Sequence, residues 1–399
     1  MKTTLKIILI GVVLLVSAGQ AFAYPPDNAA VLYYKAFILK EEPDDALGKI
    51  LAAVGKGEAK PDDKVRQYIE RNRYVIKYAV AAAGISHCDW GYDLSEGISM
   101  RLPELAKCRQ MAYILTADAR MLAEKGDYKE ALERCITVHK MGIHVGNDTV
   151  IQVVISSAIG SMANKCIVDI LPHVSNNTET LEWLGGQLAD ISGRVPSMRA
   201  AIGNEAKFYF MSPADRKELI EGVRELGLSK DELDKADKIF SQHNENEFYV
   251  RATEYYQGIL SRVQIAYDLP YPQATQAMED LNKEIENTTK AKPEAVMTRI
   301  LFPGINQFVM IDIRNRTQFN AVLAGIDIYL VRAKTGKLPD ELPAGLPKDL
   351  FSGKDFLYAK TGAGFTLTGQ GKGLDDDSGF ALTGQSKDIV HKYEFKVAK

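Results

Sequence analysis

Three consecutive aspartates near the C-terminus are the residues of this sequence best suited to binding a metal ion. Asp375, Asp376 and Asp377 lie between Gly373 and Gly379, so hard carboxylate oxygens stand on a flexible backbone, which suits Ca²⁺. Their spacing differs from that of an EF-hand loop, and three adjacent carboxylates do not all point at one ion. We therefore expect either a calcium site or a solvated acidic turn.

A second group of reactive residue types is His87-Cys88-Asp89-Trp90. A thiol beside an imidazole suggests a nucleophile or a metal site. However, adjacent side chains in an extended loop point to opposite sides, whereas a catalytic pair must lie within hydrogen-bonding distance. We expect this segment to be a packed loop or half of a disulfide.

Two further histidines, His139 and His144, lie on one predicted helix. They are five residues apart, which places them about 140° apart around the helix axis. Zinc-binding pairs on helices are three or four residues apart, so we expect no metal site here. The sequence also lacks the G-x-S-x-G, Walker A, G-x-G-x-x-G and C-x-x-C motifs.

The N-terminus has the pattern of a secretory signal peptide. Lys2 and Lys6 precede the apolar run Ile7–Val16, and Ala21-Phe22-Ala23 follows as a small-residue cleavage site. We expect residues 1–23 to be removed, which places the protein in the periplasm or at the cell surface. An uncleaved anchor is the alternative, but the apolar run is shorter than the roughly 20 residues that span a bilayer.

Export would expose the four cysteines to an oxidising compartment, where three pairings are open. If one bridge forms, we expect it between Cys88 and Cys108, because the loop of Cys88 can reach the start of the next helix. A core of this size does not need a bridge, so free buried thiols are the alternative.

The overall composition is that of a globular protein. The formal net charge is −3 and the apolar share is 46%. The small charge does not support binding to nucleic acid or to anionic lipid. The apolar share excludes disorder, and the length suits two or three domains. Beyond the signal peptide we expect no transmembrane segment.

Helical periodicity dominates from Tyr24 to about Arg332. We predict a helical domain over residues 24–302, and a last long helix introduced by Phe302-Pro303-Gly304. The segment Leu122–Leu132 resembles the turn of a tetratricopeptide repeat. Because no second copy follows at a period of about 34 residues, we expect one repeat-like hairpin within an irregular helical array or bundle.

The pattern changes from helix to short strands after Gly336. Several prolines exclude a regular helix there. Phe356–Tyr358 and Gly364–Thr368 are expected to form an antiparallel hairpin, which should pack on the helix ending near Arg332 because an isolated hairpin is marginally stable. We therefore assign residues 303–399 to a small module of one helix and an antiparallel sheet.

This tail resembles the C-terminal part of type II secretion major pseudopilins. The matching segments are Tyr329, Gly336-Lys337-Leu338-Pro339, Leu346–Gly353, Tyr358, Gly364–Leu367 and Asp375–Asp377. Major pseudopilins bind calcium in the corresponding loop, so the resemblance implies a Ca²⁺ site at these aspartates. Leu350 replaces the usual proline, a secretory signal replaces the prepilin peptide, and a long helical region precedes the module. These departures argue against a pilus subunit.

The whole layout is similar to a group of uncharacterised secreted proteins, common in planctomycete-type bacteria, that join a helical region to such a tail. This resemblance implies an architecture and a periplasmic or surface location, with no established activity. We predict a mainly α-helical, non-enzymatic envelope protein that binds a protein or peptide partner or assembles at the cell surface.

Two other functions remain open. One is a periplasmic hydrolase whose site is built from residues far apart in sequence; buried polar residues meeting in one cleft of the helical domain would indicate it. Aromatic residues spread over a concave surface would instead indicate a binding protein. The other is a calcium-dependent assembly subunit, which requires the aspartate loop.

Overall fold

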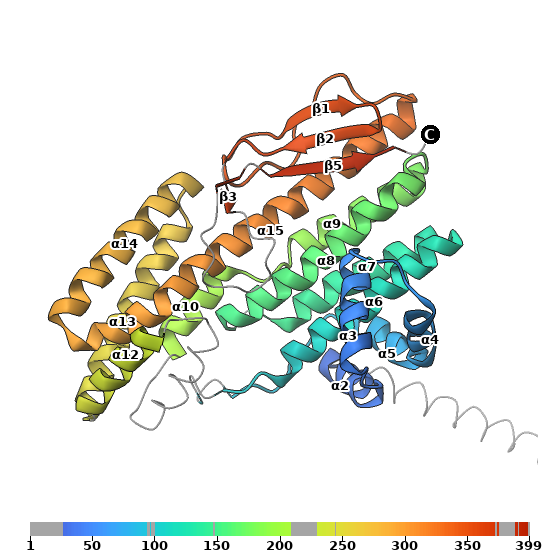
Figure 1. The fold of residues 1–399 in the computed structure, drawn as a ribbon. Helices are drawn as coiled ribbons and strands as arrows, with labels where there is room; N and C mark the ends of the chain where they lie inside the picture. Colours follow the sequence, from blue (N-terminus) through green and yellow to red (C-terminus); the bar gives the residue numbers. More distant parts are fainter. Residues whose placement is uncertain are drawn as a thin grey trace, which may run out of the picture.

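A computed structural model describes residues 27–93, 96, 100–146, 148–208, 230–243, 245–371, 373–374, 388–389 and 391–397. In this part of the chain the protein is mainly α-helical, with a small antiparallel sheet near the C-terminus, which confirms the predicted fold class (Figure 1). The expected signal peptide and the aspartates Asp375–Asp377 lie outside the described residues.

Four short helices begin the described chain. They are α2 (Ala29–Leu39), α3 (Asp45–Lys56), α4 (Asp63–Arg71) and α5 (Arg73–Ala83). Side-chain caps fix three of their starts: Asn28, Asp44 and Asp62 each accept a hydrogen bond from a backbone N–H of the first turn. Their apolar faces pack into one core with the helices that follow.

The next helices form a layered stack. They are α6 (Pro103–Lys125), α7 (Tyr128–Val145), α8 (Val150–Val174) and α9 (Thr178–Ser192). Helices α6 and α7 form the predicted hairpin, and Gly126 closes α6 with a φ of 88°, in the left-handed region that glycine favours. Thr149 and Gln152 form a capping box at the start of α8.

A second group of helices lies at the other end of the molecule (Figure 1). It consists of α10 (Met198–Phe208), α12 (Lys230–Gln242), α13 (Asn246–Tyr267), α14 (Tyr271–Ala291) and the 3₁₀ turn η3 (Pro293–Ala295). These helices share a core with the N-terminal half of α15 and the first turns of α8.

Helix α15 (Val296–Thr335) joins that group to the C-terminal sheet. It starts after Pro293 of η3 and continues through Phe302-Pro303-Gly304, so the predicted helix start was wrong. A proline tolerated in the first turn, Pro293, marks the true beginning. The expected domain boundary at residue 303 consequently falls within a helix.

The sheet contains β1 (Leu357–Thr361), β2 (Gly364–Thr368) and β5 (Lys392–Lys396), in the order β1-β2-β5 and all antiparallel. A separate antiparallel pair, β3 (Gly373–Leu374) and β4 (Asp388–Ile389), lies between β2 and β5 in the sequence. The sheet packs on the C-terminal half of α15, as expected: the Tyr329 hydroxyl donates to the Lys396 carbonyl, and its ring centroid lies 5.3 Å from that of Phe365.

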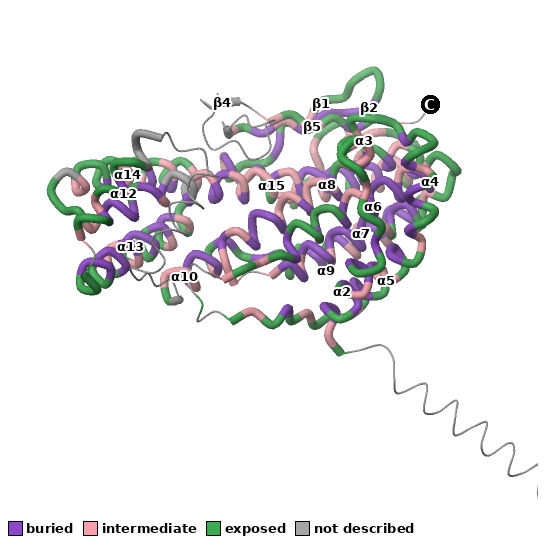
Figure 2. Tube along the Cα trace, turned by 60° about the horizontal axis from the view of Figure 1, so that its bottom comes forward, coloured by how far each residue is buried: buried purple, intermediate pink, exposed green. Residues whose placement is uncertain are grey.

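Two helical segments of the described chain are long and apolar enough to span a membrane, namely α8 and the continuous stretch Pro293–Thr335. In each, 67% of the apolar window is buried within the protein, as in the core helix of a soluble domain. Figure 2 shows this burial along α8 and α15.

Candidate functional site

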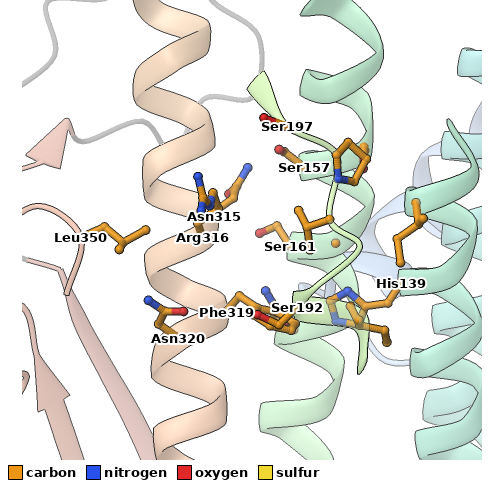
Figure 3. Close-up of a pocket in the computed structure, with 17 residues that line it drawn as sticks. His139, Ser157, Ser161, Ser192, Ser197, Asn315, Arg316, Phe319, Asn320 and Leu350 are labelled. Atoms are coloured by element: carbon orange, nitrogen blue, oxygen red, sulfur yellow. The ribbon is translucent and has the colours of Figure 1, made fainter. Parts of the chain in front are cut away.

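A polar cavity lies between α8 and α15 (Figure 3). Its volume is ≈ 180 Å³. Segments far apart in sequence line it: α7, α8, the end of α9 with the linker that follows, α15, and the loop before β1. The lining residues are His139, Ile143, Ser156, Ser157, Gly160, Ser161, Asn164, Ile191, Ser192, Val195, Pro196, Ser197, Asn315, Arg316, Phe319, Asn320 and Leu350.

Most of the polar groups in the wall are hydroxyls and amides. Serines come from α8, from the end of α9 and from the α9–α10 linker, and asparagines from α8 and α15. Ser161 Oγ donates to Gln318 Oε1 at 2.9 Å, which fixes one hydroxyl between the two helices. Asn320 Nδ2 donates to the Lys348 carbonyl at 2.8 Å, and so holds the tail loop that carries Leu350 against the cavity.

His139 forms the wall on the α7 side. It is buried, and its ring lies edge-on to Phe319 with 5.5 Å between centroids. Burial lowers the pKa of His139 to about 4, an effect that a hydrogen bond with Asn164 only partly offsets. The imidazole is therefore neutral at neutral pH. The hydrogen bond with Asn164 is poorly aligned, and both Nε2 of His139 and Oδ1 of Asn164 have almost no accessible surface.

Arg316 is the one cationic residue among those that line the cavity. Its Nη1 donates to the Tyr267 hydroxyl at 2.9 Å and lies 3.9 Å from Asp312 Oδ2. The Tyr267 hydroxyl in turn donates to Asp312. Burial raises the pKa of Asp312, although the hydrogen bond from Tyr267 and the charge of Arg316 oppose this. The three groups hold the guanidinium at the cavity edge.

Small residues allow α7 and α8 to approach closely behind the cavity. A Cβ on Gly142 would lie 3.3 Å from the Ser156 carbonyl oxygen, and one on Gly160 would lie 3.7 Å from His139 Nδ1. Any larger side chain at position 160 would extend into the space in front of the imidazole. Glycine at this position therefore keeps the cavity open.

The arrangement is suited to holding a polar molecule. Hydroxyls and amides both donate and accept hydrogen bonds, Arg316 adds a positive charge, and no carboxylate belongs to the wall. Among the described residues no group of three or more His, Cys, Asp or Glu side chains could hold a metal ion. No serine hydroxyl is hydrogen-bonded to His139 Nε2.

Of the residues singled out from the sequence, His139 lines the cavity, whereas His144 and the segment His87–Trp90 lie outside its wall. All four cysteines are free thiols. Burial raises the pKa of both Cys88 and Cys108, and at Cys108 the nearby Glu104 and Cys88 add to this rise. No Cys88–Cys108 bridge is formed, and this pairing stays a prediction. The loop that contains Cys88 is packed, since Trp90 Nε1 donates to the His144 carbonyl at 2.6 Å. The aspartates Asp375–Asp377 fall outside the described residues.

Sequence reasoning missed this cavity, although α8 carried a signal. On an otherwise apolar helix, Ser157, Ser161 and Asn164 follow one another at spacings of four and three residues, which places them on one face. On α15, Arg316 and Asn320 are four residues apart and repeat the pattern. Two polar stripes on long buried helices indicate that the helices face each other across a polar space.

No family model, no curated protein and no solved structure matches this chain. The resemblances to pseudopilins and to the planctomycete-type group therefore remain predictions.

Proposed function

We propose that this protein is a non-enzymatic binding protein of the cell envelope that holds a small polar ligand in the cavity between α8 and α15. One observation carries the proposal: five separate segments bring hydroxyls, amides, one guanidinium and a neutral imidazole to a single concave space. Concave sites with a few converging polar groups are the usual form of small-molecule sites. The protein or peptide partner expected from the sequence would then contact the outer surface.

The envelope location is part of the proposal and is supported by the N-terminal sequence. Lys2, Lys6, the apolar run and Ala21-Phe22-Ala23 form a signal-peptide pattern. Fractionation of cells that express the full chain tests it. Recovery of the protein in the cytoplasmic fraction, with residues 1–23 still attached, would contradict the location but not the cavity.

A cavity-filling variant tests the binding role. Gly160→Val places branched carbon in front of His139, whereas Gly258→Val is a matched control because a Cβ there meets nothing within 4 Å. Both lie within helices, so their effects on helix propensity are similar. The intact protein is titrated by calorimetry with a panel of amino acids, short peptides, monosaccharides and small carboxylates. Binding that Gly160→Val abolishes and Gly258→Val preserves supports the proposal, and no binding by any panel member contradicts it.

A second candidate is the hydrolase. Polar residues that meet in one cleft, with a neutral His139 among several serines, are the feature expected of it. Labelling with a fluorophosphonate probe tests this function. Labelling that is lost in His139→Gln would favour the hydrolase. Absence of labelling in the native protein would contradict the hydrolase and leave the binding role as the remaining candidate.

A further inference from the structure

Helices α7 and α8 follow each other in the chain and pack face to face behind the cavity. On α7, Cys135, His139 and Gly142 are four and three residues apart, which places them on one side of the helix. Contacts across the pair follow in order, since Gly142 lies against Ser156 and His139 against Gly160. As the position on α7 falls, its partner on α8 rises, so Cys135 faces a residue of α8 beyond Gly160.

That residue is Cys166. The Cys135 thiol donates a hydrogen bond to the Cys166 sulfur. Both side chains are fully buried, in the core that lies under the sheet. A disulfide requires Cβ atoms about 3.5–4.5 Å apart, so two sulfurs already in contact on closely packed helices can be joined with little movement of the backbone.

A bridge at this point would close a loop over residues 136–165, which contains every residue that α7 and α8 contribute to the cavity wall. His139 lies one turn after the first cysteine and Asn164 lies two residues before the second. The bridge would therefore hold the two helices together next to the hydrogen bond between His139 and Asn164. Because a cross-link acts mainly by restricting the unfolded chain, it should stabilise this wall without reshaping it.

We infer that Cys135 and Cys166 form a disulfide that joins α7 to α8 when the chain folds in an oxidising compartment. The free thiols of the structure are the reduced form of this pair. The inference goes beyond the proposed binding function, and it does not depend on the identity of the ligand.

The oxidant is a second disulfide, either in glutathione or in a thiol–disulfide oxidoreductase. One cysteine loses its proton to solvent, and its thiolate attacks this disulfide, which gives a mixed disulfide and releases one thiolate. The thiolate of the other cysteine then attacks the protein sulfur of the mixed disulfide, forms the bridge and releases the second thiolate. Two cysteine thiols are oxidised and one external disulfide is reduced to two thiols. Since both sulfurs are buried in the folded protein, this exchange takes place during folding.

Refolding in a glutathione buffer tests the bridge without relying on export. The full chain is reduced, unfolded in urea, refolded by dilution into oxidised and reduced glutathione, and alkylated under denaturing conditions before digestion. Trypsin cleaves directly before both cysteines, after Arg134 and Lys165, so the bridge joins peptides 135–140 and 166–194. We expect this linked pair in the mass spectrum, with a mass two hydrogen atoms below the sum of the separate peptides.

The pairing expected from the sequence gives different peptides. A bridge between Cys88 and Cys108 would join peptides 78–101 and 108–109. Recovery of Cys135 and Cys166 as alkylated peptides from the refolded protein, with or without the other bridge, would overturn the inference. Fractionation of cells tests the envelope location separately, so failure of the location and failure of the bridge are distinguishable.

Sensitivity to reductant provides a second readout. The bridge closes a loop of intermediate length, so the urea midpoint of the oxidised protein should exceed that of the reduced protein by about 0.5–1 M. The double variant Cys135→Ala/Cys166→Ala should lose this difference, whereas the matched control Cys88→Ala/Cys108→Ala should keep it. Each variant is compared with its own reduced form, so lost packing cancels. A difference that persists in the first variant or vanishes in the control would contradict the bridge.

Discussion

At the scale of single residues, His139 links the cavity to the stability of the fold. Burial lowers the pKa of its imidazole to about 4, whereas in the unfolded chain a histidine titrates near 6.5. As the pH falls, the unfolded state takes up this proton first. The neutral ring therefore contributes stability that is fully present above about pH 6.5 and is lost as the pH falls through about 4.

We predict that this loss amounts to something on the order of 3 kcal/mol, since one pKa unit corresponds to about 1.4 kcal/mol. The measurement is the free energy of unfolding in urea, for the native protein and for His139→Gln, between pH 7 and pH 4. The advantage of the native protein over the variant should shrink by that amount across the range.

The native protein and His139→Gln must be compared because Glu205 changes the free energy of unfolding with pH in the direction opposite to His139. Burial raises the pKa of Glu205 to about 7, partly offset by its hydrogen bond from the Val150 N–H. Its destabilising contribution therefore grows as the pH rises from about 4.5 to about 7. Glu205 is present in both proteins, so it cancels in the difference. A difference that does not change with pH would contradict the role assigned to His139.

At the scale of elements, the contact between α15 and β5 depends on one glycine. A Cβ on Gly325 would lie 2.4 Å from Phe395 Cε1, a distance that real contacts do not reach. The ring of Phe395 stacks on Phe365 at 4.9 Å between centroids, so it has little freedom to move aside. Gly325 thus determines how closely the sheet approaches the helix.

We predict that Gly325→Ala destabilises the protein by about 1–3 kcal/mol, because overpacking outweighs the gain in helix propensity. Gly258→Ala, on the exposed face of α13 where a Cβ meets nothing within 4 Å, should stabilise the protein by about 0.5–1 kcal/mol. Urea unfolding followed by circular dichroism measures both. Equal stabilisation by the two substitutions would show that the sheet adjusts freely.

Local signals predicted the elements well where caps and turns carry the information. The hairpin turn at Gly126 and the docking of the sheet below Arg332 followed from sequence alone. The start of α15 did not, because Pro293 and Pro303 are both local helix-start signals, and only packing shows that the chain remains helical through the second.

The tail motif shows the same limit for a single side chain. In the sequence, Asp349 is one residue of the segment Leu346–Gly353 that resembles the pseudopilin tail. In the structure it is fully buried, and its carboxylate accepts hydrogen bonds from the Phe351, Gln370 and Gly371 backbone N–H groups and from the Ser352 hydroxyl. Two of these donors are more than twenty residues away in sequence. The cavity is harder still to predict, because its walls come from five segments whose proximity no local pattern encodes.

At the scale of the whole molecule, α8 connects three hydrophobic cores. Its first turns, including Val150, join the core of α10 and α12–α15. Its middle, around Ile159, joins the core of the N-terminal helices. Its last turns, including Ile167, join the core under the sheet. A helix shared in this way should make the three regions unfold together, because none keeps its core when α8 is lost.

The two tryptophans allow this coupling to be measured. Trp90 packs in the N-terminal core and Trp183 packs against the core under the sheet. We predict that Ile167→Ala, which removes a fully buried side chain, lowers the free energy of unfolding by about 2–5 kcal/mol. Because α8 is shared, Trp90 fluorescence in a Trp183→Phe background and Trp183 fluorescence in a Trp90→Phe background should report the same shift in urea midpoint. A shift seen by Trp183 alone would mean that the cores unfold independently, and that the cavity between α8 and α15 can open without loss of the N-terminal helices.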